Sequence, residues 1–243
     1  MTSTEISFAK NPVVAHRGAF KKNGFPENSI ASLKEAIRLG CTGSEFDVRM
    51  SADDSLLVNH DPHHNGLDIE KTGFAELRRF PLANGEPLPL LRSYLREGMD
   101  KNTRTRLVLE IKPSVISKER GVIIARKVFE LVKEMKAEAL TVYISFDYGI
   151  LQELRRLDPQ ASLQYLEGDK SPAQLKAEGI NGADYHYSVF KKNPHWIKEA
   201  KAHGILLNAW TVNDKETMEW LLKEGFDFIT TNEPETLLVR LAD

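Results

Sequence analysis

Charged side chains stand inside apolar, strand-like runs of the chain. Glu45 and Asp47 lie in SEFDV, and Glu110 and Lys112 lie in RLVLEIK. Because alternate side chains of a β-strand leave on the same face, each pair projects from one side of its strand. Three carboxylates facing one another away from water repel strongly and would take up protons. A divalent cation removes this repulsion, and ligands that are all oxygen favour Mg²⁺ or Ca²⁺ over zinc.

Two histidines and an arginine close other strand-like runs. His16 and Arg17 follow PVVA, and His60 ends LLVNH. Imidazoles titrate near neutrality and can serve as acid and base. Arg17 and Lys112 offer positive charge to an anionic substrate. A metal, two cations and two histidines together match phosphodiester cleavage, in which charge on the phosphoryl oxygens is stabilised while protons move to and from the attacking and leaving oxygens.

Strand-like runs alternate with amphipathic stretches along the 243 residues. The strands are expected at residues 12–16, 44–48, 56–60, 106–112, 140–145, 162–166, 183–187, 205–210 and 226–231. A typical helix pattern is NSIASLKEAIRLG, which Asn28 or Ser29 caps and Gly40 ends. About eight strand–helix repeats predict a (β/α)8 barrel. A doubly wound open sheet is the alternative, which the lack of a GxGxxG or phosphate loop after any strand disfavours.

The predicted barrel places the charged residues at one mouth. Active sites of such barrels lie where the strands end at their carboxyl side, so the candidate residues should converge there. Residues 61–105, with HHNGLDIEKTG and PLANGEPLPL, are predicted to form an insertion of loops and a short helix over this mouth. Residues 1–243 are then expected to form a single domain.

Composition excludes several functional classes. With 33 Lys+Arg against 35 Asp+Glu, the formal charge of -2 gives no global attraction to nucleic acid or to an anionic membrane. One cysteine, Cys41, excludes an intrachain disulfide and a cysteine-based zinc site. No apolar stretch is long enough for stable membrane insertion, and MTSTEISFAK lacks the basic start and apolar run by which a signal peptide would be predicted. A cytoplasmic enzyme is expected, or a periplasmic or secreted one if an export signal has been removed; the oligomeric state stays open.

Several motifs resemble, in family order, the signatures of glycerophosphodiester phosphodiesterases. They are AHRGAF…FPENSIASLKEAIRLG, GSEFDVRMSADDSLLVNHDP, LVLEIKP, WTVND and FDFITTNEP, and they run from about residue 13 to 236. The family is a TIM barrel that uses a divalent cation to hydrolyse glycerophosphodiesters, which are small-molecule substrates, to glycerol 3-phosphate and an alcohol. The resemblance implies a role for each candidate residue: metal ligands Glu45, Asp47 and Glu110, acid–base pair His16 and His60, phosphate contacts Arg17 and Lys112, and Trp210 over the glycerol end.

Some alternatives stay open at this point. Glu45 and Asp47 could belong to a strand with one solvated face, and Trp210 could be a core residue. HHNGLDIEKTG replaces a family segment with an arginine and paired threonines, and PLPLL replaces IPTL, which leaves the alcohol moiety open. A phospholipase D-like relative acting on choline lipids would need an apolar rim, whereas the predicted insertion is polar. A barrel that binds a phosphorylated ligand without catalysis would have lost a ligand or a histidine.

Overall fold

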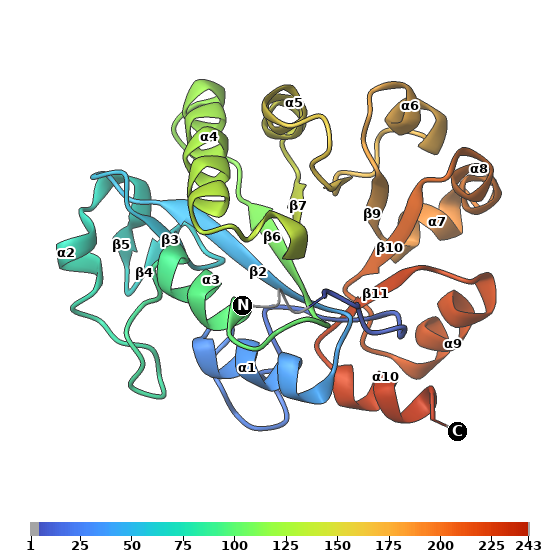
Figure 1. Ribbon diagram of the computed structural model, residues 1–243, viewed down its shortest axis with the longest axis horizontal. Helices are drawn as coiled ribbons and strands as arrows, with labels where there is room; N and C mark the ends of the chain where they lie inside the picture. Colours follow the sequence, from blue (N-terminus) through green and yellow to red (C-terminus); the bar gives the residue numbers. More distant parts are fainter. Residues whose placement is uncertain (1–4, 243) are drawn as a thin grey trace.

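Eight parallel strands close into a barrel in the computed structural model, which describes residues 5–242 (Figure 1). Residues 1–4, the start of the segment in which no signal peptide is predicted, and residue 243 lie outside the described residues. Around the barrel the strands follow in the order β1 (Val13–Ala15), β2 (Gly43–Met50), β6 (Arg106–Ile111), β7 (Thr141–Ser145), β8 (Leu163–Tyr165), β9 (Gly182–His186), β10 (Leu206–Trp210) and β11 (Phe228–Thr231). β1 pairs with both β11 and β2, which closes the ring and confirms the (β/α)8 prediction.

Helices between the strands surround this barrel. They are α1 (Ile30–Leu39), α3 (Leu91–Met99), α4 (Lys118–Glu134), α5 (Tyr148–Leu157), α6 (Pro172–Ala177), α7 (Tyr187–Lys192), α8 (His195–His203), α9 (Lys215–Glu224) and α10 (Pro234–Arg240), with the 3-10 turn η2 (Glu138–Leu140) before β7. In α1 the side chain of Ser29 accepts a hydrogen bond from the Ser32 N–H. Gly40 ends the helix at φ 73°, a left-handed conformation that glycine adopts without strain. The cap and stop predicted for this helix are therefore confirmed, with Ser29 rather than Asn28 as the cap.

The segment between β2 and α3 differs from the sequence prediction. β1 pairs only with Gly43 and Ser44, which leaves that edge of β2 open farther along. β3 (Leu56–Val58) fills the edge as an antiparallel strand, with Val58 opposite Val48, so residues 56–60 form no barrel strand. The hairpin of β4 (His63–His64) and β5 (Leu67–Asp68), the turn η1 (Ile69–Lys71) and α2 (Phe74–Leu77) follow. α3, inside the predicted insertion, is the barrel helix that packs beside α1.

Apolar residues occupy both faces of the barrel wall, as expected for buried parallel strands. The main core lies between the strands and the surrounding helices. A smaller apolar cluster fills part of the barrel interior and comprises Val14, Val108, Val142, Ile144 and Leu166, with Phe146, Trp210 and Phe228 packed against it. No helix within residues 5–242 has the length and apolar character needed to cross a membrane.

Candidate active site

The predicted catalytic residues meet at one end of the barrel interior. A cavity of about 130 Å³ is lined by His16, Arg17, Glu45, His60, Glu110, Lys112, Ile144, Phe146, Leu166, Asp184, Trp210, Thr211 and Thr230. Asp47 is the one predicted residue that does not line the cavity, and its carboxylate lies directly beside those of Glu45 and Glu110. The structure thus brings all eight candidates together.

Three carboxylates form an acidic triad, Glu45, Asp47 and Glu110, in which one oxygen from each lies within 4.8 Å of the others. β2 supplies the first two on alternate positions, and Glu110 of β6 is the register partner of Asp47. Glu45 is 3% exposed and Asp47 is 1% exposed, so the alternative of a solvated strand face is wrong. Burial is the main cause that raises the pKa of Glu45 well above its usual range, and repulsion from Asp47 and Glu110 adds to it. Burial and repulsion from Asp47 raise the pKa of Glu110 to about 7.

Two cations partly compensate the acidic triad. Lys112 Nζ lies 2.8 Å from Glu110 Oε1 and 3.3 Å from Asp47 Oδ1. Arg17 donates its backbone N–H to Glu45 Oε2 at 2.8 Å, and its Nε lies 3.6 Å from Asp47 Oδ2. Burial favours a higher pKa for Asp47, but the charge of Lys112 and the other positive and hydrogen-bonding neighbours outweigh it and lower this pKa. Asp47 is consequently the member of the triad that is held ionised.

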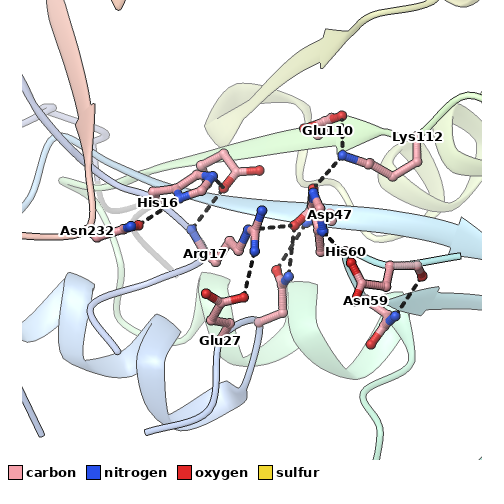
Figure 2. A network of polar contacts seen from close by, with 12 residues as sticks. His16, Arg17, Glu27, Asp47, Asn59, His60, Glu110, Lys112 and Asn232 are labelled. Atoms are coloured by element: carbon pink, nitrogen blue, oxygen red, sulfur yellow. Dashed lines mark hydrogen bonds and ion pairs between the residues drawn. The ribbon is translucent and has the colours of Figure 1, made fainter. Parts of the chain in front are cut away.

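His16 is held in place from the far end of the chain. Its Nδ1 lies 2.7 Å from Asn232 Oδ1, beyond the end of β11, and its Nε2 lies 3.9 Å from Glu45 Oε2 (Figure 2). Burial, followed by the charge of Arg17, lowers the pKa of His16 below its usual value. The imidazole is therefore neutral near pH 7, and with Nδ1–H donating to Asn232 its Nε2 can accept a proton.

His60 reaches the same cavity by a different route from the predicted one. It follows the antiparallel β3, and the Asn59 N–H donates to the Asp47 carbonyl at 3.0 Å, which holds the segment beside the acidic triad. The His60 carbonyl accepts a hydrogen bond from Arg49 Nε at 2.8 Å. The Nδ1 atom of the His60 ring lies 2.8 Å from Asp61 Oδ1. His60 therefore lines the site although it does not end a barrel strand.

Trp210 closes one side of the cavity. Its indole Nε1–H donates to the Asp184 carbonyl at 2.8 Å, and its ring meets Phe146 edge-on at 5.5 Å between centroids. These contacts fix the ring orientation, and with Ile144 and Leu166 they form an apolar wall opposite the charged residues.

Three further polar residues belong to the site, and sequence reasoning did not assign them to it. Asn28, at φ 59°, donates from Nδ2 to Asp47 Oδ2 at 2.8 Å and accepts from the Asp47 N–H at 3.1 Å. Asn232 holds His16, and Asp184 is a buried acid in the cavity wall. Asp184 lies inside the strand-like run ADYHY, so the signal that singled out Glu45 could have found it. Both asparagines lie inside motifs that resemble the family, Asn28 in FPENSIASLKEAIRLG and Asn232 in FDFITTNEP, but their partners are distant in the sequence.

The acidic triad fits a hard divalent cation. All its donor atoms are carboxylate oxygens, the class that Mg²⁺ and Ca²⁺ prefer. Glu45 Oε1 is buried without a hydrogen-bond partner, which is costly unless a cation or water satisfies it. A bound cation would also relieve the repulsion that raises the pKa of the two glutamates.

Comparisons with known proteins agree with this geometry. Residues 16–236 match the sequence model of the "Glycerophosphoryl diester phosphodiesterase family". The chain is 29% identical to a glycerophosphodiester phosphodiesterase of Caldanaerobacter subterraneus subsp. tengcongensis, over 94% of this chain and 97% of that one. It is similar, with a TM-score of 0.92 and 41% identity, to the crystal structure of a glycerophosphodiester phosphodiesterase from Parabacteroides distasonis, covering 97% of this chain and 98% of that one. An Oleispira antarctica phosphodiesterase solved in complex with the product sn-glycerol-3-phosphate has a TM-score of 0.82 and 25% identity, with 96% and 97% covered.

Proposed function

This chain belongs to the glycerophosphoryl diester phosphodiesterase family, and we propose that it hydrolyses glycerophosphodiesters to glycerol 3-phosphate and an alcohol with a divalent cation and two histidines. The observation that carries this proposal is the meeting of a buried acidic triad, two cations and two imidazoles around one cavity. The relative from Oleispira antarctica, which holds sn-glycerol-3-phosphate, supports the choice of glycerol as the alcohol that stays on the phosphate.

The acidic triad would hold the cation, and its three carboxylates leave room in the coordination shell for water and for substrate oxygens. When bound, an ion of this type supplies Lewis-acid stabilisation of charge on the phosphoryl oxygens. Mg²⁺ and Ca²⁺ are both compatible with the donor set. Asn28 keeps Asp47 in its orientation for this role by the two hydrogen bonds it makes with that residue.

Arg17 and Lys112 would contact the phosphate. Both line the cavity, and both already lie beside carboxylates of the acidic triad. Their contacts with these acids hold the two positive charges at fixed positions before the phosphodiester enters. Charges that are preorganised in this way stabilise the transition state without reorganising during the reaction.

The two histidines would move the protons. One imidazole takes the proton of the attacking hydroxyl at its free ring nitrogen, and the other gives a proton to the oxygen of the leaving alcohol. The neutral state of His16 near pH 7 suits the acceptance of a proton. The attacking hydroxyl is either a water or the 2-hydroxyl of the glycerol, and both present an O–H to the same base. Trp210 would lie over the glycerol end of the substrate.

The test measures release of glycerol 3-phosphate from glycerophosphocholine in the presence of Mg²⁺, Ca²⁺ or EDTA. We expect release with at least one of the two ions and none in EDTA. Glu45→Gln, which keeps the shape of the side chain but removes its charge, should need a much higher metal concentration.

Two outcomes would contradict the proposal. Glycerol 3-phosphate that binds without any glycerophosphodiester being cleaved, with either ion, would instead favour a binding protein. Faster choline release from lysophosphatidylcholine than from glycerophosphocholine would favour the phospholipase D-like alternative.

A further inference from the structure

Asp184 is a buried acid for which the proposed chemistry has no use. It lies on β9, lines the cavity, and is 2% exposed. Its Oδ1 has no hydrogen-bond partner, and no Lys, Arg or His within residues 5–242 lies at ion-pair distance from it. Leaving a buried polar atom unpaired costs about 1–3 kcal/mol, so a group that the chain itself does not provide is expected to complete the site.

The surroundings of Asp184 suit a neutral polar group. Asn208 on β10 is its register partner, and Thr230 donates from Oγ1 to Asn208 Oδ1 at 3.1 Å. Gln164 on the other neighbouring strand, β8, is 2% exposed. Asn208 and Thr230 are an amide and a hydroxyl, and the charged group that affects Asp184 is Glu110, which adds to burial in raising the pKa of Asp184. A hydroxyl can both donate to and accept from a carboxyl group, so it can satisfy Asp184 in this environment.

The barrel order places Asp184 across the interior from the acidic triad. β9 is the fourth strand from β2 in either direction around the ring, through β6, β7 and β8 or through β1, β11 and β10. A phosphate held by Arg17 and Lys112 therefore lies on the far side of the cavity from Asp184. The glycerol carbon that lies farthest from the phosphate is then the one that reaches β9.

The size of the cavity also decides which part of the substrate enters it. A partly open cavity of about 130 Å³ has room only for a small group. Glycerol is the part that all glycerophosphodiesters share, whereas the esterified alcohol varies in size and has to point out of the mouth. Trp210, fixed by its hydrogen bond to the Asp184 carbonyl, flanks the same space.

We propose that the carboxyl group of Asp184 hydrogen-bonds the terminal hydroxyl of the glycerol moiety and so makes the enzyme selective for substrates that carry this hydroxyl. The inference rests on the proposed function, since it assigns a substrate contact for that reaction. A site built to bind a hydroxyl rejects the analogue that lacks it, because its own buried polar atom is then left unpaired.

The test compares glycerophosphocholine with 2-hydroxypropyl phosphocholine, in which hydrogen replaces only the terminal hydroxyl. Both substrates keep the 2-hydroxyl and the same leaving choline, so choline release reports both. We expect the wild-type kcat/KM to be at least about tenfold higher for glycerophosphocholine. Asp184→Ala should bring the ratio of the two values close to one. Asp184→Asn, which still donates and accepts hydrogen bonds, should keep most of the selectivity.

Gln164→Ala is the matched control. It removes another buried polar side chain from the neighbouring strand, at a position that does not line the cavity, and should keep the wild-type ratio. A wild-type ratio near one, or the same ratio in Asp184→Ala as in wild type, would overturn the assignment.

Binding measurements separate this inference from the proposed function. Calorimetric titration with glycerol 3-phosphate and with 2-hydroxypropyl phosphate reports the terminal hydroxyl without turnover. Wild type should bind glycerol 3-phosphate at least about tenfold more tightly, and Asp184→Asn, which changes the volume least, should keep this preference. Equal affinities would refute the role of Asp184, whereas a clear preference without choline release would refute only the catalytic proposal.

Discussion

Two substitutions of Asn28 should distinguish two contributions of this residue to stability. One is its hydrogen bonding to Asp47, a proposed metal ligand, and the other is the conformation of its own backbone. Asn28 is buried and makes two hydrogen bonds to Asp47, one to the carboxylate at 2.8 Å and one from the backbone N–H at 3.1 Å. Hydrogen bonds to charged groups contribute about 1.5–3 kcal/mol and neutral ones about 0.5–1.5 kcal/mol to the free energy of unfolding. Asn28→Gly should therefore lower this free energy by about 2–4 kcal/mol.

The backbone of Asn28 adds a second effect. At φ 59° the residue is left-handed, a conformation that asparagine tolerates but that costs alanine about 1–2 kcal/mol. Asn28→Ala should thus be less stable than Asn28→Gly by about 1 kcal/mol, although both lose the same two hydrogen bonds. Urea unfolding followed by tryptophan fluorescence measures both differences.

The same variants report on metal binding. A metal that binds only the folded state raises its stability by about 2.7 kcal/mol at a concentration of 100 times its Kd. Loss of a residue that orients a ligand typically weakens metal affinity about 10–100-fold, which would reduce this gain to about 1.4–0.4 kcal/mol at the same concentration. Unfolding curves with and without Mg²⁺ or Ca²⁺ supply the comparison. A metal-induced gain as large in Asn28→Gly as in wild type would refute the role of Asn28 in holding Asp47.

Three other predictions test the site and the scaffold. His16→Ala and His60→Ala should each lower kcat by about 10²–10⁴-fold with unchanged circular dichroism, and near-native rates in either would contradict the acid–base roles. Lys112→Met leaves buried carboxylates without their counter-charge and should lower the free energy of unfolding in EDTA by about 3–5 kcal/mol. Added metal should recover more stability in this variant than in wild type, and an equal gain in both would refute the reasoning. Hydrogen bonding to Arg156 lowers the pKa of Glu153 to about 2, so its contribution to stability is present above its unfolded pKa and is lost as the pH falls towards 2. Glu153→Gln should therefore cost about 1 kcal/mol at pH 7 and progressively less below pH 4.5 in urea titrations, and a cost independent of pH would count against this ion pair.

Local patterns in the chain were sufficient to predict the barrel and most of the residues that meet in its cavity. Apolar runs and helix caps recur with a regular spacing, and acids such as Glu45 and Glu110 stand out because charge is rare within buried strands. Since the strands of a parallel barrel all end at one mouth, residues near those ends could be grouped without knowledge of their contacts. Their roles as metal ligands, acid–base pair and substrate contacts stay predictions until the experiments above are done.

The other features of the site depend on pairing between segments that are distant in the sequence. His60 reaches the cavity because β1 leaves an edge of β2 open for an antiparallel strand, a matter of register that no local pattern encodes. Asn232 contacts His16 across 216 positions of the chain only because β11 closes the ring against β1. Asp184 faces an interior whose shape and polarity are formed by side chains of other strands. Hydrophobic periodicity depends on near neighbours, whereas strand register and barrel closure are set by packing across the whole molecule.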